Sequence, residues 1–413
     1  MSLVFDKNLL GSREHVPVPC CDISVELPRI GSEAFSDLAR LYSISIENFP
    51  SEPFRAAYKT IAGDSNVPWE LCMPSSAYEK EKNILFNNVI RQIETIQKNV
   101  GFSYYETYKS TEKIFDHLKP AKIDIEKYDS YLCGSDKTGL QILKTFNPGK
   151  DGFSSPTSYS RSDTITGRLK VIDGPNILHL KKDFRDILVS RWGQDGTIVY
   201  MDYKSLEPRT LLNLITSRTP YIGSLPLIKY SGKIPPDIYT HLINELRLPS
   251  VISRDLVKTA IISLLYGATK QSVVYSLKEV LESPGDLVDL VTEYFGLEEL
   301  KLALTKRYVE SDRKYILNHY DKPIFCENTV PSTLVNYYIQ STAVDIALLG
   351  FNQIVDWLAV KNLLSLVIPI YVLHDALILD VHNSIKPHLT KLASLGEDIP
   401  GFNNKFFLDV ALL

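Results

Sequence analysis

Two aspartates stand far apart in the chain, and each ends a segment with the pattern of a β-strand. Asp202 follows the β-branched, apolar segment 197–201, and Asp375 lies with His374 between two apolar segments within residues 368–381. The second arrangement predicts two strands that meet at His374 and Asp375. If a fold joins the two strand ends, their carboxylates repel each other unless cations lie between them. Taken singly, each aspartate is also explained as an ordinary turn residue.

A helix predicted over residues 251–265 lies between the two aspartates and is mostly apolar. It carries Arg254 and Lys258 four positions apart, hence on one face, and Ile262 and Tyr266 continue that stripe. A lysine on so apolar a helix calls for an anionic partner, because its unpaired burial is costly. A triphosphate would serve, and Lys258 could also protonate a departing pyrophosphate. An internal salt bridge is the alternative explanation.

Asn336 and Gln340 are also four apart, on a helix predicted over residues 331–360. Amide side chains can donate to the purine N3 and pyrimidine O2 acceptors that every base pair presents in the minor groove. Such contacts test the geometry of a pair and not its sequence. The alternative is a polar helix surface.

The composition is that of a soluble globular protein with two to four subdomains. The chain has 413 residues, of which 44% are hydrophobic and 23% charged. We find no apolar run of the roughly 18 residues needed to cross a bilayer and no signal pattern, so we expect no membrane association. An odd number of cysteines, five, without a CxxC pair argues against a disulfide framework or structural zinc and favours the reducing cytoplasm.

The net charge of −4 does not by itself indicate a nucleic-acid binder. Net charge says little, however, when an acidic metal site and a basic groove share one molecule. One segment is rich in cations, for which a solvated basic face is the alternative explanation: Arg161, Arg168, Lys170, Lys181, Lys182, Arg185 and Arg191.

The remaining elements follow from periodicity and from Gly and Pro content. Residues 1–60 have weak periodicity and no assigned role. We predict helices over 78–100, 105–118 and 205–215, with Pro208 tolerated in a first turn, and mostly helical structure over 236–316. Loops and short strands are expected over 146–175.

These residues resemble the motifs of the family A DNA polymerases, the family of bacterial DNA polymerase I. The segment DYKSLEPR at 202–209 is similar to the first motif of that family, DYSQIELR, and His374-Asp375 matches the third. The resemblance covers roughly residues 150–413, with the landmarks in the family's order. The other landmarks are Arg254, Lys258, Tyr266 and Gly267 with the spacing of the second motif, TGRL at 166–169, Pro175-Asn176, Asp237-Ile-Tyr239, and Asn336 with QSTAVD at 340–345.

The resemblance implies a template-directed DNA polymerase that uses primer–template DNA, deoxynucleoside triphosphates and two Mg²⁺ ions, for which Mn²⁺ can substitute. Accessory replication proteins are unknown. It implies metal binding by Asp202, Asp375 and the Tyr203 carbonyl, with Lys258 as a further catalytic residue. The implied nucleotide-binding residues are Arg254, Lys258, Ile262, Tyr266, Tyr239 and Glu207, the last of which would block a ribose 2′-hydroxyl. The implied DNA-binding residues are Arg168, Asn176, Asn336, Gln340, Gly267 and His374.

The implied fold class is α+β, a right-hand polymerase fold with an antiparallel β palm, helical fingers and a helical thumb. After an N-terminal segment over 1–60, we expect the thumb over 61–150, the palm over 151–215 and 331–413, and the fingers over 216–330. The family's proofreading exonuclease needs more residues than precede the palm, so we expect it to be absent.

Three positions depart from the family pattern. Ala376 replaces the usual Glu after His-Asp, Ile262 occupies a position that is usually aromatic, and Tyr239 replaces a phosphate-contacting histidine. We expect activity to survive because both principal aspartates remain. Pro208 and an extra residue near Gly174 indicate a divergent lineage, such as that of a phage or another mobile element.

Two alternatives remain at the level of sequence. A single-subunit RNA polymerase of the phage type shares the right-hand plan and also lacks Glu after His-Asp, although Glu207 disfavours ribonucleotides. The other alternative is a catalytically inactive, polymerase-derived module that only binds DNA. Primer extension with each nucleotide set separates the three possibilities.

Overall fold

The computed structural model describes residues 2–20, 23, 27–62, 67–99, 103–216, 234–245, 247–249 and 252–413. The chain forms two compact units, Met1–Lys109 and Ser110–Leu413. The boundary between them lies within the segment expected as the thumb, 61–150, and inside helix α6 (Ser103–His117).

The first unit is built on a long amphipathic helix and a two-stranded antiparallel sheet. Helix α5 (Ser75–Asn99) confirms the helix predicted over 78–100, although Val100 lies outside the described residues. Its apolar face buries Val89 and Ile93 completely in a core that also holds Phe5. Residues 1–60, which had no clear periodicity, contribute several short elements. The elements besides α5 are β1 (Ser2–Phe5), α1 (Lys7–Leu10), β2 (Val16–Pro19), α2 (Glu33–Leu41), α3 (Glu52–Ala62) and α4 (Trp69–Cys72).

The second unit contains a four-stranded antiparallel sheet in the order β10-β11-β7-β12. The predicted strand at 197–203 is β7 (Gly196–Tyr203), and the predicted hairpin is β10 (Val367–Leu373) with β11 (Ala376–His382). Leu373 pairs with Ala376, so His374 and Asp375 form the turn, as predicted. The edge strand β12 (Leu408–Leu412) was not predicted.

Both faces of this sheet are covered, and the alternation of side chains along β7 decides which residue faces which layer. Val199, Met201 and Tyr203 pack in the core of the long helix α15 (Pro331–Val360). Ile198 packs on the opposite face, in a core shared with α7 (Ile125–Gly134) and α8 (Lys137–Lys144). Asp202 therefore belongs to the face opposite α15.

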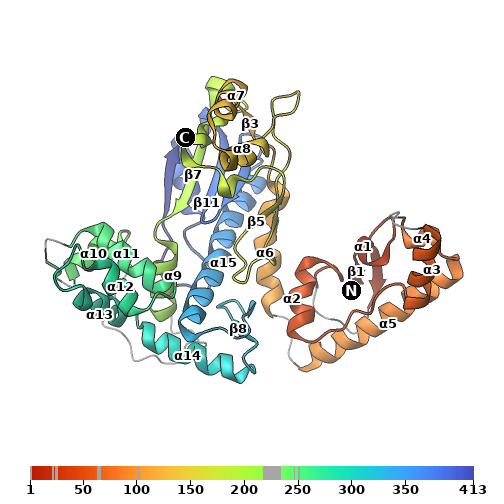
Figure 1. Cartoon of the computed structure of the whole chain (residues 1–413). Coiled ribbons are helices and arrows are strands. Elements are labelled where there is room, and N and C mark those ends of the chain that lie inside the picture. The colour runs from red at the N-terminus through yellow and green to blue at the C-terminus, as the bar shows by residue number, and fades with distance from the viewer. Residues whose placement is uncertain are drawn as a thin grey trace. The chain divides into compact units, whose positions relative to one another are not determined.

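Helix α15 spans the predicted residues 331–360 and begins with Pro331 at its first turn. In Figure 1 it extends from the sheet to the helical part of the second unit. Its length and composition would allow it to cross a membrane, but 61% of its most apolar stretch is buried inside the fold. Burial of this kind is typical of a core helix.

The helical part has a core of its own, which confirms the mostly helical structure predicted over 236–316. Helix α11 (Arg254–Leu265) begins at Arg254, because the Ser253 hydroxyl accepts a hydrogen bond from the Leu256 amide at 3.3 Å. The start predicted at Val251 lies outside the described residues. The other helices of this part are α9 (Leu206–Thr216), α10 (Ile238–Glu245), α12 (Lys270–Leu277), α13 (Pro284–Tyr294) and α14 (Leu297–Glu310).

Short elements complete the second unit. The two-stranded pairings are β3 (Lys122–Ile123) with β6 (Leu188–Val189), β4 (Ser158–Ser160) with β5 (Lys170–Asp173), and β8 (Tyr315–Leu317) with β9 (Pro323–Phe325). The short helices are η1 (Ile177–His179), η2 (Lys182–Ile187), η3 (Gly193–Asp195), η4 (Asn383–His388) and α16 (Leu389–Ser394).

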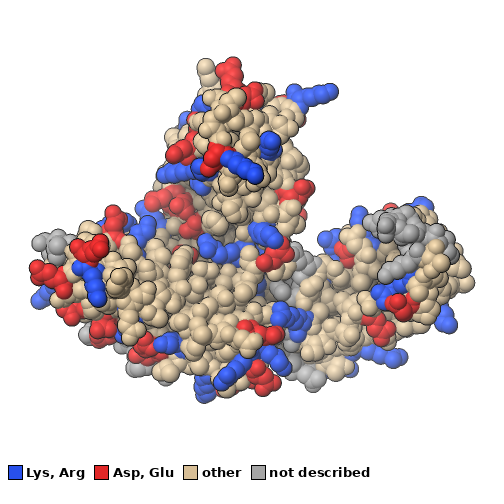
Figure 2. All heavy atoms as spheres, viewed as in Figure 1, with Lys and Arg blue, Asp and Glu red and all other residues tan. Residues whose placement is uncertain are grey.

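The cation-rich segment 161–191 is not a uniform solvated face. Arg161 is only 4% exposed and forms an ion pair with Asp345 of α15, which is fully buried. Arg191 donates through Nε to Asp380, also buried, at 2.9 Å. The explanation as a solvated basic face is therefore wrong for these two residues, whose charges are neutralised inside the fold. Figure 2 likewise shows basic and acidic side chains interspersed over the face drawn.

Candidate active site

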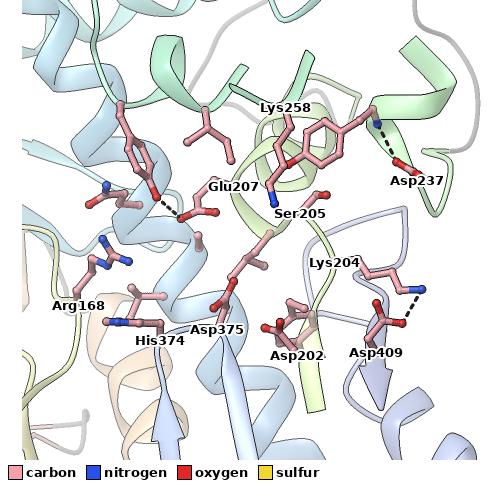
Figure 3. A pocket seen from close by; sticks show the side chains of 18 of the residues that line it. Arg168, Asp202, Lys204, Ser205, Glu207, Asp237, Lys258, His374, Asp375 and Asp409 are labelled. Atoms are coloured by element: carbon pink, nitrogen blue, oxygen red, sulfur yellow. Dashed lines mark hydrogen bonds and ion pairs between the residues drawn. The ribbon is translucent and has the colours of Figure 1, made fainter. Parts of the chain in front are cut away.

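A cavity of about 530 Å³ lies where the end of β7, the β10–β11 turn and β12 face helices α9, α11 and α15. All of its lining residues belong to the second unit, and Figure 3 shows 18 of them. Every element of this cavity except β12 carries a residue that the sequence motifs singled out.

Asp202 and Asp375 come together at this cavity. Ala376, the first residue of β11, pairs directly with Asp202, and the Tyr203 amide donates to the Asp375 carbonyl at 3.1 Å. The carboxylates of both residues therefore lie at the same end of two hydrogen-bonded strands, as Figure 3 shows. A tight hairpin makes this possible because His374 adopts a left-handed backbone conformation, with φ of +54°.

The two carboxylates hold their protons more tightly than ordinary aspartates. Desolvation, followed by the carboxylate of Asp409, raises the pKa of Asp202 from 3.8 to about 6. Desolvation, followed by the charge of Asp202, raises the pKa of Asp375 to about 7. Desolvation and repulsion between carboxylates therefore disfavour the charged forms of this pair when no cation is bound. This is the condition in which a bound divalent cation is most stabilising.

Lys258 projects from α11 into the cavity. Its side chain is exposed, and within the described ranges it makes no ion pair. Arg254, one turn earlier, donates through Nε to Asp237 Oδ2 at 2.9 Å and lies 5.0 Å from the centre of the Tyr239 ring. The internal salt bridge considered as an alternative is therefore present for Arg254 and not for Lys258. Tyr239 is itself only 2% exposed, although it lines the cavity.

Glu207 and Tyr266 join α9 to the end of α11 across the cavity. The Tyr266 hydroxyl donates to Glu207 Oε1 at 3.3 Å, and the tyrosine ring is 44% exposed. Ile262 lies one turn before Tyr266 and is partly buried. The three side chains form one wall of the cavity, where a carboxylate, a phenol ring and a branched aliphatic group are held together.

Arg168 and His374 line the cavity on one side of the two aspartates (Figure 3), and Gln340 of α15 also lines it. Desolvation, with smaller contributions from Arg168, His179 and Arg185, lowers the pKa of His374 to about 4. The imidazole of His374 is therefore neutral at pH 7, and it can donate one hydrogen bond and accept another.

Three predicted site residues do not line the cavity: Asn176, Asn336 and Gly267. Asn176 Oδ1 lies 2.9 Å from His179 Nδ1. The backbone amide of Asn176 donates to Thr145 Oγ1 at 2.9 Å. Gly267 follows α11 with φ of +85°, and a Cβ there would lie 3.1 Å from the Ser332 carbonyl. Tyr203 does line the cavity, but its ring is buried and its hydroxyl donates to the Gly396 carbonyl at 2.6 Å.

Comparison with known proteins finds a match by structure but no match by sequence. No family model matches the chain, and no curated protein matches it. Its structure is similar to the POL domain of Pol1 from M. smegmatis, solved in complex with a DNA primer–template and a dNTP. The match has a TM-score of 0.53 and 14% sequence identity, and it covers 92% of this chain and 81% of that chain. The chain has the fold of a polymerase domain.

Three charged residues of the cavity were not predicted as site residues. Asp409 of β12 pairs in register directly opposite Asp202, and Lys204 Nζ lies 2.7 Å from Asp409 Oδ1. Asp237 holds Arg254. The first two lie in or beside strands, and their neighbours become apparent only from the strand order. Asp237 could have been found from the segment Asp237-Ile-Tyr239.

Within the described residues, no group of three or more His, Cys, Asp and Glu side chains is arranged to hold a metal ion. The candidate donor set is instead the carboxylates of Asp202 and Asp375 beside the Tyr203 backbone. Mg²⁺ commonly binds through one or two carboxylates and completes its coordination with water and substrate phosphates. The donor set therefore fits Mg²⁺ in the presence of a phosphorylated substrate.

The raised pKa values predict how pH affects the metal-free protein. Folded Asp202 and Asp375 titrate near pH 6 and 7, and unfolded aspartates near 3.8, so the native state holds more protons in between. The stability contributed by these groups must therefore fall as pH rises from about 4 to about 7, and the loss persists above that range. With EDTA at pH 8, Asp375→Asn should raise the unfolding temperature by roughly 1–3 °C. The gain should shrink at pH 4.5, and an equal gain at both pH values in thermal denaturation would contradict this explanation.

Proposed function

We propose that this protein is a template-directed DNA polymerase, a nucleotidyltransferase that adds deoxynucleotides to a primer 3′ end. The observation that carries the proposal is the meeting of Asp202 and Asp375 in one cavity with Lys258 and Arg254. The polymerase-domain fold supports it.

Two Mg²⁺ ions, held by Asp202, Asp375 and the Tyr203 carbonyl, would activate the primer 3′-hydroxyl and neutralise charge on the leaving pyrophosphate. The raised pKa values support this assignment, because a bound cation would offset the desolvation and repulsion that disfavour the two ionised carboxylates. Mn²⁺ prefers similar oxygen ligands and should substitute.

The helix α11 supplies the contacts to the nucleotide. Lys258 and Arg254 bind the triphosphate by charge-assisted hydrogen bonds, and Tyr239 supports Arg254 through its ring. As the primer 3′-oxygen bonds to the α-phosphorus and the bond to pyrophosphate breaks, Lys258 donates a proton to the leaving group. Tyr266 and Ile262 form the surface beside the nascent base pair and its sugar. Glu207 occupies the space that a ribose 2′-hydroxyl would need.

The opposite side of the cavity would hold the primer–template. Arg168 and Gln340 donate to minor-groove acceptors of the terminal base pair. The neutral imidazole of His374 lies near the primer terminus. Asn336 on α15, Gly267 after α11 and Asn176 extend this surface beyond the cavity.

In this proposal the sheet and its flanking segments, 151–215 and 331–413, are the palm of a right hand. Residues 216–330 are the fingers, and residues 61–150 are the thumb. We infer a cytoplasmic protein from the cysteines, and the four in the described part of the chain are unpaired. We also propose a divergent phage or mobile-element lineage within the family A polymerases.

Primer extension tests the proposal. A labelled primer annealed to a longer DNA template, incubated with Mg²⁺ and the four dNTPs, should be extended, and ribonucleotides should be used far less well. Efficient extension with ribonucleotides instead would favour the RNA polymerase alternative. DNA binding without extension in Mg²⁺ or Mn²⁺ would favour an inactive DNA-binding module.

A further inference from the structure

The ion pair between Lys204 and Asp409 lies in the cavity, beside the two aspartates. Lys204 follows Asp202 by two residues, and Asp409 is the direct strand partner of Asp202. Lys204 Nζ lies 2.7 Å from Asp409 Oδ1, and both side chains line the cavity. None of the contacts proposed above uses either residue.

This pair is too exposed to be needed for the fold. The Lys204 side chain is 38% exposed and that of Asp409 is 62% exposed. Exposed pairs of this kind contribute little to stability and exchange partners readily. The strand edge itself is fixed by the backbone, since the Lys204 amide donates to the Phe407 carbonyl at 2.9 Å.

The ion pair of Lys204 and Asp409 lies on the side of the cavity that β12 forms. The strand order puts β12 on the far side of β7 from the β10–β11 hairpin. In Figure 3, Lys204 and Asp409 are accordingly separated from Arg168 and His374 by the two aspartates. Asp237, the partner of Arg254, is drawn on the same side as Lys204. On this side of the cavity, Arg254 is paired with Asp237, and Lys204 is paired with Asp409.

Among the described residues that line the cavity, few cations are free to bind phosphate. Lys258 makes no ion pair among the residues that the structure describes, but Arg254 is shared with Asp237. Tyr239, which stands where the resembled motif has a histidine, is buried and brings no charge. The triphosphate of a nucleotide carries more negative charge than these groups balance. A lysine ammonium on a flexible stem is suited to supply a further point charge.

We propose that Lys204 is a further cationic contact for the terminal phosphates of the incoming nucleotide, and that Asp409 holds it in place until the nucleotide binds. The inference rests on the proposed function, since it assigns the phosphate end of the same nucleotide site. On binding, the ammonium exchanges the carboxylate for a phosphate oxygen with a larger charge.

Equilibrium binding of a nucleotide to variants tests this assignment. The probe is one complementary dNTP with Mg²⁺, titrated into the protein bound to a fluorescent primer–template whose primer ends in a dideoxynucleotide, so that no chemistry occurs. Lys204→Met should raise the Kd for the dNTP about tenfold, and Lys204→Arg should restore most of the affinity. In steady-state extension, Lys204→Met should raise KM by a similar factor and change kcat much less.

Lys405→Met is the matched control. Lys405 is a surface lysine shortly before β12, is paired with Asp398 at 3.1 Å, and does not line the cavity. It should leave the Kd for the dNTP within about twofold of wild type. Thermal unfolding of each variant identifies any loss of fold.

The outcomes separate this inference from the proposed function. If wild type binds the dNTP and Lys204→Met binds it equally well, Lys204 is only a partner of Asp409 and the inference is wrong. The inference is also wrong if Lys204→Met lowers affinity and Lys204→Arg does not restore it. If wild type binds no complementary dNTP, the proposed function itself is contradicted.

Discussion

Asp375→Asn should lower the rate of primer extension by at least about a thousandfold while the protein still binds primer–template DNA. Asparagine has nearly the shape of aspartate, so the turn between β10 and β11 should be kept. The lost charge removes half of the carboxylate pair that the cavity offers to divalent cations. Single-turnover extension in Mg²⁺ and a DNA-binding titration measure the two effects separately.

A matched control removes one carboxylate from the same unit without touching the cavity. Asp356 lies on α15, is 53% exposed, and pairs only loosely with Lys113 at 3.6 Å. Asp356→Asn should extend primers at close to the wild-type rate. If Asp375→Asn extends as fast as Asp356→Asn, then Asp375 does not take part in the chemistry.

Glu207→Ala should raise the use of ribonucleotides relative to deoxyribonucleotides by about 10- to 100-fold. The Glu207 side chain is partly buried and is held in the cavity by the Tyr266 hydroxyl at 3.3 Å. Alanine would leave room for a 2′-hydroxyl beside the sugar. The ratio of kcat/KM for each nucleotide class on one template measures the effect.

Tyr266→Phe provides an internal comparison for this prediction. It keeps the ring beside the nascent base pair but removes the hydroxyl that orients Glu207, so its discrimination should lie between those of wild type and Glu207→Ala. A wild-type protein that prefers ribonucleotides, with a preference that Glu207→Ala does not change, would reject the DNA polymerase assignment in favour of an RNA polymerase.

The sequence predicted those parts of the site that depend on local pattern. Strand β7, the β10–β11 hairpin and helix α15 lie where the periodicity of apolar residues placed them. In each of these elements, the apolar residues recur with the spacing of one face, and in this unit those residues are the buried ones. The meeting of Asp202 and Asp375 was an expectation from the resemblance, and the strand order brings it about.

Contacts between segments distant in sequence could not be predicted in the same way. Arg161 belongs to a cation-rich segment, yet it is buried against Asp345. The loop between β4 and β5, which carries both Arg161 and Arg168, packs on α15. Strand β12 is a short edge strand with a weak signal, so neither Asp409 nor its pairing with Lys204 was expected. The choice of Asp237 as partner of Arg254 likewise depends on how α10 and α11 meet. Periodicity reports which face of an element is buried and does not report which partner covers it.

The central claim is that Asp202 and Asp375 share a pair of divalent cations. The most direct measurement is anomalous X-ray diffraction from crystals of the protein with a dideoxy-terminated primer–template, a complementary dNTP and Mn²⁺. We expect two manganese peaks, roughly 3.5–4 Å apart, in contact with the carboxylates of Asp202 and Asp375. A complex with bound nucleotide but no manganese at these two carboxylates would contradict the claim.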